Sequence, residues 1–329
     1  MCDFISASIL QHKMNEAASH HIPFLFAIDY EQKEGLFIEE PSEQSTVKWR
    51  VPNKTNFETS PKIKKPSSIV FHPHPESKER YAERFNIVVD NLKKGNSFLA
   101  NLTVKTPLEM NLSLEQIFAL SDSPYAILVP DRFVCFSPEI FIRINAQGRI
   151  SSYPMKGTID ASFPDAETTI FNDKKESAEH FTIVDLIRND LSMVADQVQV
   201  DRLRYIDRLQ TSSNQLLQVS SEISGQLPDD YLNRLGDILM TLLPAGSITG
   251  APKWSTQDII HQAEREPRGY YTGVFGYFDG QTLDTAVMIR FIEQDKGAFY
   301  FRSGGGITAL SNLHLEYEEV IQKIYLPFR

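Results

Sequence analysis

The sequence predicts an α+β fold with large antiparallel β-sheets. Short apolar segments follow one another with only turn residues between them, which is typical of antiparallel strands. Amphipathic helical segments stand between these groups of strands, and strict alternation of strand and helix is missing. The 329 residues, 41% of them hydrophobic, suffice for one large domain or two with a substantial core.

Residues 1–77 are expected to form a short N-terminal segment and an irregular connection, ahead of a main body at residues 78–329. Between residues 41 and 77 the composition shifts to Pro, Ser, Lys and Thr, and the prolines interrupt both helical and strand periodicity. His72 and His74 flank a proline in this stretch without a supporting carboxylate, so a plain loop is favoured over a metal pair.

The main body is expected to begin with a helix over residues 79–94. Gly95 ends it, because glycine tolerates the left-handed geometry of a helix stop. An extended segment follows at residues 97–105. Four short apolar segments separated by turn residues then predict an antiparallel meander, at residues 125–129, 132–136, 140–144 and 149–153.

A long helix is predicted over residues 173–195, because apolar residues recur there at three- and four-residue steps. They are Phe181, Val184, Ile187, Leu191 and Val194. Further helices are expected at residues 230–243, 253–263 and 313–325. A second meander is expected at residues 271–278, 285–292 and 298–303.

Composition narrows the class of function. The net charge is −10 and no Lys/Arg-rich run with interleaved aromatics occurs, so we expect no nucleic-acid partner. Cys2 and Cys135 suggest neither a disulfide framework nor a metal cluster, which fits a reducing cytosol. The apolar run at residues 22–28 is too short to span a membrane and is not placed as a secretion signal. We therefore expect a soluble, cytoplasmic protein with no membrane partner.

Lys156 lies in the segment Tyr-Pro-Met-Lys-Gly-Thr, directly after an apolar, alternating run. Pro154 and Gly157 predict a tight turn around it. A lysine held in such a turn is a candidate nucleophile, whereas a lysine taken alone is more often a solvated surface group.

The last predicted helix places Glu316, Glu319 and Lys323 on one face, either as a solvated surface or as a functional one. Glu179, in the long helix, shares a face with Glu176. If the two helices meet, Glu179, Glu319 and Glu316 supply hard oxygen ligands without histidine or cysteine, which suits Mg²⁺ bound together with substrate oxygens.

Three further segments are candidate binding groups. The glycines Gly304, Gly305 and Gly306 form either a flexible turn or a backbone N–H nest for an anion. Residues 246–253 lack the spacing of a nucleotide phosphate loop, although contacts to a smaller anion remain open. Arg290 is predicted to lie inside a strand, either in an ion pair or binding a carboxylate. Glu139, at the start of a strand, is either an exposed glutamate or an acid with a raised pKa.

The order and spacing of four blocks resemble the chorismate-utilising enzymes, closest to the aminodeoxychorismate synthase component I branch. The blocks are residues 153–158, 178–190, 246–253 and 304–307. The resemblance covers roughly residues 79–327 and implies two large antiparallel sheets packed together and flanked by helices, as in anthranilate synthase component I. It also implies that residues 78–329 are a chorismate-binding catalytic domain.

The resemblance also implies a role for each matched residue. Glu179 and Glu319 would bind Mg²⁺, with Glu316 nearby, and Arg290 and Tyr271 would hold the enolpyruvyl carboxylate. Lys323 and the backbone of Gly304, Gly305 and Gly306 would hold the ring carboxylate, while Thr249 belongs to the block expected to contact substrate. Glu139 would protonate the departing C4 hydroxyl, and Lys156 would add to ring C2.

Two positions depart from the branch. Leu99 stands where isochorismate synthases have a water-activating lysine and where the ammonia-using branch usually has glutamine. Gln218 stands where that branch usually has histidine. The predicted reaction converts chorismate and ammonia to 4-amino-4-deoxychorismate for p-aminobenzoate and folate synthesis. Anthranilate synthase component I and a catalytically silent chorismate-binding regulatory subunit are the alternatives.

The source of ammonia is expected to be a separate glutamine amidotransferase subunit. Neither Cys2 nor Cys135 lies in the glycine-flanked turn that a glutaminase nucleophile needs.

Overall fold

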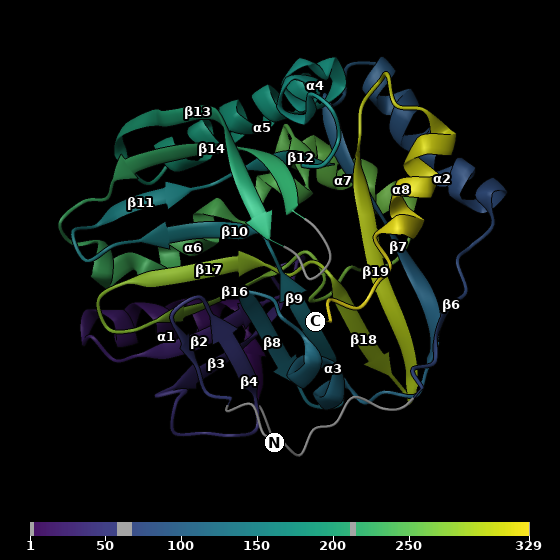
Figure 1. Ribbon diagram of the computed structural model, residues 1–329. Coiled ribbons are helices and arrows are strands. Elements are labelled where there is room, and N and C mark those ends of the chain that lie inside the picture. The colour runs from purple at the N-terminus through teal and green to yellow at the C-terminus, as the bar shows by residue number, and fades with distance from the viewer. Residues whose placement is uncertain (1–2, 58–67, 211–214, 329) are drawn as a thin grey trace.

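Two antiparallel sheets form the body of the protein in the computed structural model, which describes residues 3–57, 68–210 and 215–328 (Figure 1). The α+β fold with two large sheets, predicted above, is therefore confirmed. Within the described residues no helix is long and apolar enough to cross a membrane.

The first sheet has ten strands and contains both N-terminal and central parts of the chain. In spatial order they are β1 (Phe4–Ser6), β3 (Glu34–Glu39), β2 (Phe24–Ile28), β16 (Val274–Phe278), β17 (Leu283–Val287), β10 (Ile140–Ile144), β11 (Arg149–Ser152), β14 (Gln215–Gln226) and β12 (Met155–Asp160), with β13 (Asp196–Gln210) paired to β14.

The second sheet has nine strands and is built around the long pair β7 and β19. The order is β15 (Gly250–Ala251), β7 (Leu99–Met110), β19 (Ala298–Ile307), β18 (Phe291–Asp295), β9 (Phe133–Ser137), β8 (Tyr125–Val129), β4 (Lys48–Val51) and β5 (Lys54–Thr55), with β6 (Phe71–Pro73) paired to β7.

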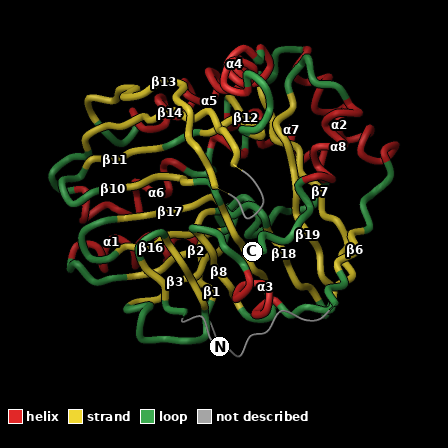
Figure 2. Tube along the Cα trace, in the orientation of Figure 1, coloured by secondary structure: helices red, strands yellow, loops and turns green. Residues whose placement is uncertain are grey.

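Helices cover the two sheets, and apolar side chains are buried between the layers. Helices α1 (Ala7–Ser19), α5 (Lys174–Ser192) and α6 (Leu235–Leu242) pack on the ten-stranded sheet. Helices α2 (Lys78–Lys93), α7 (Lys253–Glu264) and α8 (Leu313–Gln322) pack on the nine-stranded sheet, with α2 and α8 side by side (Figure 2). The remaining helices are α3 (Leu114–Leu120), α4 (Ala166–Asn172), and the 3-10 helices η1 (Tyr231–Arg234) and η2 (Gly246–Ile248).

The predicted long helices are confirmed with small changes in their bounds. Ser77 caps α2, and Gly95, with φ of +80°, follows its C-terminus as expected. Asp173 caps α5 through a side-chain hydrogen bond from the backbone N–H of Glu176. These capping groups satisfy backbone donors that a helix end leaves without a partner.

The prediction of an irregular connection at residues 41–77 is wrong in part, because three strands, β4, β5 and β6, lie within these residues. The proline-rich composition concealed the short pairing of Lys48–Val51 with β8. Strands from both sides of residue 77 also share each sheet, because β2 pairs with β16 and β4 with β8. The division of the chain at residue 77 stays a prediction.

Both predicted meanders pass between the sheets instead of staying in one. β9 belongs to the nine-stranded sheet and β10 to the ten-stranded sheet. The single strand expected at residues 285–292 is likewise two strands, β17 and β18, in different sheets. Arg290 lies between these strands and not inside one, with φ of +54°. Period-two alternation indicates a strand but does not say where the chain leaves a sheet.

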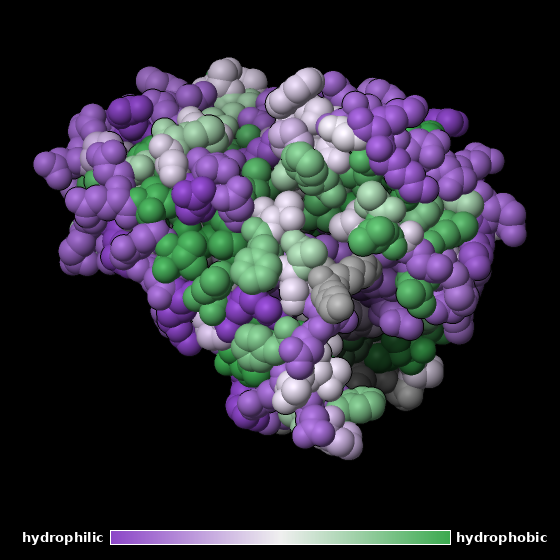
Figure 3. All heavy atoms as spheres, turned by 90° about the horizontal axis from the view of Figure 1, so that it is seen from above, coloured by the Kyte–Doolittle hydropathy of each residue, from purple (hydrophilic) through white to green (hydrophobic). Residues whose placement is uncertain are grey.

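The surface seen from above, as in Figure 3, has hydrophobic side chains around its centre and hydrophilic side chains toward its rim.

Candidate active site

The candidate site lies where the chain crosses twice from one sheet to the other. The β9–β10 crossing carries Glu139, and the β17–β18 crossing carries Arg290. The crossings are hydrogen-bonded together: the N–H of Phe136 donates to the carbonyl of Arg290 at 3.1 Å, and the N–H of Val287 donates to the carbonyl of Glu139 at 3.1 Å. Arg290 has a positive φ, which costs energy for a residue with a side chain and is common at functional sites.

A cavity of about 660 Å³ opens at this junction, a size suited to a small organic substrate. Ten of the predicted site residues line it: Glu139, Lys156, Glu179, Tyr271, Arg290, Gly304, Gly305, Gly306, Glu319 and Lys323. The structure therefore brings together residues that are far apart in the sequence.

Lys156 lies in strand β12 and not in the predicted tight turn. A register shift between Lys156 and Thr158 marks a β-bulge, and Gly157 adopts φ of +68° there. Gly157, which was expected to form a tight turn with Pro154, therefore belongs to a β-bulge. The Nζ of Lys156 donates to Oε2 of Glu179 at 3.4 Å, with 21% of the lysine side chain and 5% of the glutamate side chain exposed. The amine is held at the cavity wall.

Glu139 accepts a hydrogen bond on Oε1 from the hydroxyl of Ser247. Burial raises the pKa of Glu139, while the hydrogen bond from Ser247 and the charge of Lys156 oppose the rise. A carboxyl group with a raised pKa retains its proton nearer to neutral pH, as a general acid requires.

The three glycines continue strand β19 opposite β7, so they form neither the flexible turn nor the nest after a strand that were considered above. None has a positive φ. Their lack of side chains provides space: a Cβ on Gly306 would lie 3.3 Å from Oε2 of Glu179 and 3.4 Å from Nζ of Lys156. A Cβ on Gly305 would lie 3.2 Å from Oε1 of Glu319.

Helix α8 brings its charged face to these glycines. Lys323, the C-cap residue, donates from Nζ to Oε1 of Glu319 at 2.6 Å and to the carbonyl of Gly304 at 2.8 Å. Glu319 and Lys323, which were predicted to share a helix face, thus form an i,i+4 ion pair. Burial lowers the pKa of Lys323, whereas the charge of Glu319 opposes the change.

The carboxylates fit a hard divalent cation in donor type, since no sulfur or imidazole belongs to the set. Glu179 and Glu319 face the bare positions Gly306 and Gly305. Glu316 is buried and does not line the cavity, although one of its oxygens would lie 3.9 Å from a Cβ on Gly305. No group of three His, Cys, Asp or Glu side chains in the described part of the chain is arranged as a metal site. Glu179 and Glu319 line the cavity, so their carboxylates are the donors of this set that a cation bound in it would meet.

Arg290 and Tyr271 both line the cavity. The Nε of Arg290 donates to the hydroxyl of Tyr325 at 3.1 Å, which orients the guanidinium. Tyr271 is buried, and burial raises its pKa, so it stays a neutral donor. A planar guanidinium and a phenol suit recognition of a carboxylate.

Thr249 is not brought to the cavity. It is fully buried, and its hydroxyl donates to the carbonyl of Ala245 at 2.8 Å. Its neighbours Ser247 and Ile248 line the cavity instead. Sequence reasoning assigned the block but not the residue, because it could not tell which hydroxyl of the Gly-Ser-Ile-Thr loop faces inward.

Asn101 also lines the cavity and was not singled out from the sequence. Its side-chain Oδ1 is buried without a hydrogen-bond partner, which makes it a candidate for contact with a bound molecule. The only signal in the sequence was its place two residues after Leu99.

The two departures lie close to the site. Leu99 is 3% exposed, and its Cδ1 would lie 3.3 Å from a Cβ on Gly306, so an apolar side chain lies beside the glycine strand here. Gln218 lines the cavity and lies opposite Thr158, beside the bulge that carries Lys156.

The sequence model of chorismate binding enzymes matches residues 8–329. A Haemophilus influenzae protein described as an "Uncharacterized PabA-like protein" is 50% identical over 98% of this chain and 98% of its own length. Aminodeoxychorismate synthase component 1 of Salmonella typhimurium is 31% identical, covering 75% of this chain and 56% of that protein. Anthranilate synthase component 1 of Haloarcula marismortui is 32% identical, covering 75% of this chain and 52% of that protein.

Solved structures agree on the fold. Anthranilate synthase component I from Streptococcus pneumoniae has a TM-score of 0.66 at 26% identity, over 78% of this chain and 59% of that chain. MenF, the menaquinone-specific isochorismate synthase of Escherichia coli, has a TM-score of 0.74 over 97% of this chain and 81% of that chain. At 16% identity, the second likeness concerns the fold alone.

Proposed function

Because the chain belongs to the chorismate binding enzymes, we propose that it converts chorismate and ammonia to 4-amino-4-deoxychorismate, as aminodeoxychorismate synthase component I does. The observation that carries the proposal is the placement of Lys156. Its amine lines the same cavity as Glu139 and lies beside Gly306, where no side chain shields it from a bound molecule.

The proposed chemistry balances in two steps. Glu139 gives its proton to the C4 hydroxyl, which leaves as water while the amine of Lys156 adds at C2 and the ring double bonds shift. Ammonia then attacks C4, the double bonds shift back and the amine of Lys156 leaves C2. The carboxylate of Glu139 takes a proton from the new ammonium group. The sum is chorismate plus ammonia giving aminodeoxychorismate plus water.

The remaining residues bind and orient the substrate. Arg290 and Tyr271 would hold one carboxylate, and Lys323 would hold the other beside the glycine strand. Glu179 and Glu319, with Glu316 near them, would hold Mg²⁺, which when bound supplies positive charge to anchor the ring carboxylate.

Anthranilate synthase component I is the second candidate, and identity does not separate the two, since the relatives quoted lie at 31% and 32%. Lys156 favours the first, because it stands where the resemblance places the lysine that adds to ring C2 in that branch. A silent regulatory subunit is disfavoured, because Glu139 and Lys156 both line the cavity.

The test is direct. Purified protein is incubated with chorismate, Mg²⁺ and an ammonium salt, and the product is identified by mass and absorbance. We expect non-aromatic 4-amino-4-deoxychorismate, loss of turnover with EDTA and its return with excess Mg²⁺. Full turnover in metal-free buffer would remove the carboxylate site from the proposal, and absence of any product would remove the activity.

A further inference from the structure

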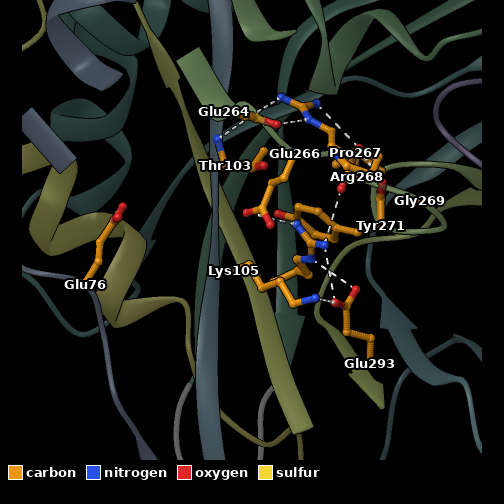
Figure 4. Close-up of polar contacts among 12 residues, drawn as sticks. Glu76, Thr103, Lys105, Glu264, Glu266, Pro267, Arg268, Gly269, Tyr271 and Glu293 are labelled. Carbon is orange, nitrogen blue, oxygen red and sulfur yellow. Dashed lines mark hydrogen bonds and ion pairs between the residues drawn. The ribbon is translucent and has the colours of Figure 1, made fainter. Parts of the chain in front are cut away.

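Arg268 is a fully buried cation outside the cavity wall, with 1% of its side chain exposed. It follows α7 and precedes β16. Its guanidinium forms a bidentate pair with Glu264: Nε donates to Oε2 at 2.9 Å, and Nη2 donates to Oε1 at 2.7 Å (Figure 4). Such a fork fixes the plane and the direction of the remaining donors.

The remaining donors of Arg268 reach the backbone of the cavity wall. Nη2 donates to the carbonyl of Asn101 at 2.6 Å, and Nη1 donates to the carbonyl of Ile248 at 2.9 Å. Asn101 and Ile248 both line the cavity, the first from β7 and the second from η2.

The same guanidinium reaches the segment that carries Tyr271. Nη1 lies 3.4 Å from the hydroxyl of Thr272, and that hydroxyl donates to the carbonyl of Tyr271 at 2.6 Å. The backbone of Thr272 adopts φ of +62°. A β-branched residue in this region is strained and needs surrounding contacts to hold it. Arg268 supplies one of them.

Glu264 and Glu31 fix the arginine itself. Oε1 of Glu264 accepts the backbone N–H of Thr103 at 2.8 Å, so the pair holds β7 at a second point. The carboxylate of Glu31 accepts the N–H groups of Arg268 at 2.8 Å and of Gly269 at 3.0 Å. The side chain of Arg268 is thus tied to α7, β7, η2 and the segment that precedes β16.

We infer that Arg268, locked by Glu264, is a positioning residue that sets the relative placement of three cavity-wall segments, at residues 99–104, 246–249 and 270–273, and through them the binding of chorismate. The kinetic part of this inference rests on the proposed function. The placement of the segments does not.

Arg302 provides a matched control. It is also buried, with 5% of its side chain exposed, and its Nε pairs with Glu293 at 3.1 Å, beside Lys105. Its other hydrogen-bond and ion-pair partners are Glu266 and the carbonyl of Pro267. None of these partners lines the cavity, and the charge of Arg302 acts on the cavity residue Tyr271 without a hydrogen bond between them. Loss of stability should be common to both arginine variants, because removing one partner of a buried ion pair is destabilising in either place.

The experiment compares Arg268→Lys with Arg302→Lys in the full chain. Lysine keeps the charge but loses the planar fork. We expect both variants to lower the melting temperature. Only Arg268→Lys should speed amide hydrogen exchange in the three segments and raise the KM for chorismate by about tenfold or more, with a smaller change in kcat. If Arg268→Lys does not fold, Glu264→Gln, which keeps the volume of the side chain, takes its place with the same expectation.

Equal exchange in the three segments for the two arginine variants would overturn the inference, whatever the kinetics. The expected exchange pattern in a protein that does not consume chorismate would support the positioning role and reject the proposed function. Normal turnover in the wild type together with an unchanged KM in Arg268→Lys would reject the kinetic part of the inference and keep the proposed function.

Discussion

Glu139 and Lys156 reach one cavity through two different local irregularities. Glu139 lies at a crossing between sheets, and Lys156 lies at a bulge in β12. A regular strand would direct alternate side chains to opposite faces and would not aim these groups at a common point. The sequence signals for both irregularities, Pro138 before Glu139 and Gly157 after Lys156, were visible, but they indicate only that regular structure is interrupted.

Lys156 should form a covalent adduct when chorismate and Mg²⁺ are present without ammonia, because no second nucleophile is then available to release it. Intact-protein and peptide mass spectrometry should place the added mass on Lys156. Lys253, whose Nζ is paired with Asp190 at 2.6 Å, should stay unmodified. Lys156→Ala should abolish turnover, and wild-type turnover in this variant would contradict the covalent role.

Ser247→Ala should move the pH profile of kcat/KM toward alkaline pH. In the proposed mechanism Glu139 acts in its protonated form, so activity should fall as the pH rises through its pKa. The hydroxyl of Ser247 lowers that pKa by stabilising the carboxylate, so its removal raises the pKa and carries the descending limb to higher pH. Free ammonia is held constant across the series.

Ser255→Ala is the control for this profile, since its hydroxyl is exposed and contacts only the carbonyl of Pro252 in the described structure. The role of Glu139 as the acid would be contradicted if the descending limb of the kcat/KM profile in Ser247→Ala stayed in place or moved toward acidic pH.

At the scale of elements, the helices could be predicted from the sequence, whereas the sheet to which each strand belongs could not. Apolar periodicity located α5, and Gly95 marked the end of α2, because both signals are local. The strand predicted at residues 285–292 failed, because both halves alternate correctly while they belong to different sheets. What decides the crossing is long-range pairing: β17 lies beside β16 and β10, and β18 lies beside β19 and β9.

Strand β19 contributes to the site through the side chains that it lacks, and Gly306→Ala tests this. Gly306 has no positive φ, so the backbone accepts alanine, but the new Cβ would contact Glu179 and Lys156 at 3.3 and 3.4 Å. We expect turnover to fall by about tenfold or more because small displacements of reacting groups are costly. The melting temperature should change by only about a few degrees.

Ser303→Ala, on the same strand and outside the cavity wall, should keep its activity. Equal turnover in Gly306→Ala and the wild type would show that the bare strand is not required for substrate binding.

The whole molecule joins parts that sequence reasoning separated. The N-terminal strand β2 pairs with β16, and β16 follows the segment that carries Arg268 and Tyr271. Glu31, in the turn after β2, accepts the N–H of Arg268, so the N-terminal segment supports the cavity wall. No local pattern predicts such a contact. The resemblance to a family predicted the architecture because it carried the pairing information that composition and periodicity lack.

The proposed reaction needs a source of ammonia, and the one cysteine among the described residues is not placed to release it from glutamine. Cys135 is buried, its thiol donates to the carbonyl of Ile289 at 3.2 Å, and burial raises its pKa well above the ordinary range. A thiol in this state is a poor nucleophile. Cys2 lies outside the described residues.

Glutamine alone should therefore support no reaction, whereas ammonium at alkaline pH, which supplies free ammonia, should support it. Addition of a glutamine amidotransferase subunit that binds this chain should make glutamine effective. Product analysis by mass and fluorescence completes the test. The blue fluorescence of anthranilate would move the activity to the second candidate. Isochorismate formed from water would show that Leu99 does not prevent hydration, and turnover with glutamine alone would show that a nucleophile other than Cys135 serves as the glutaminase.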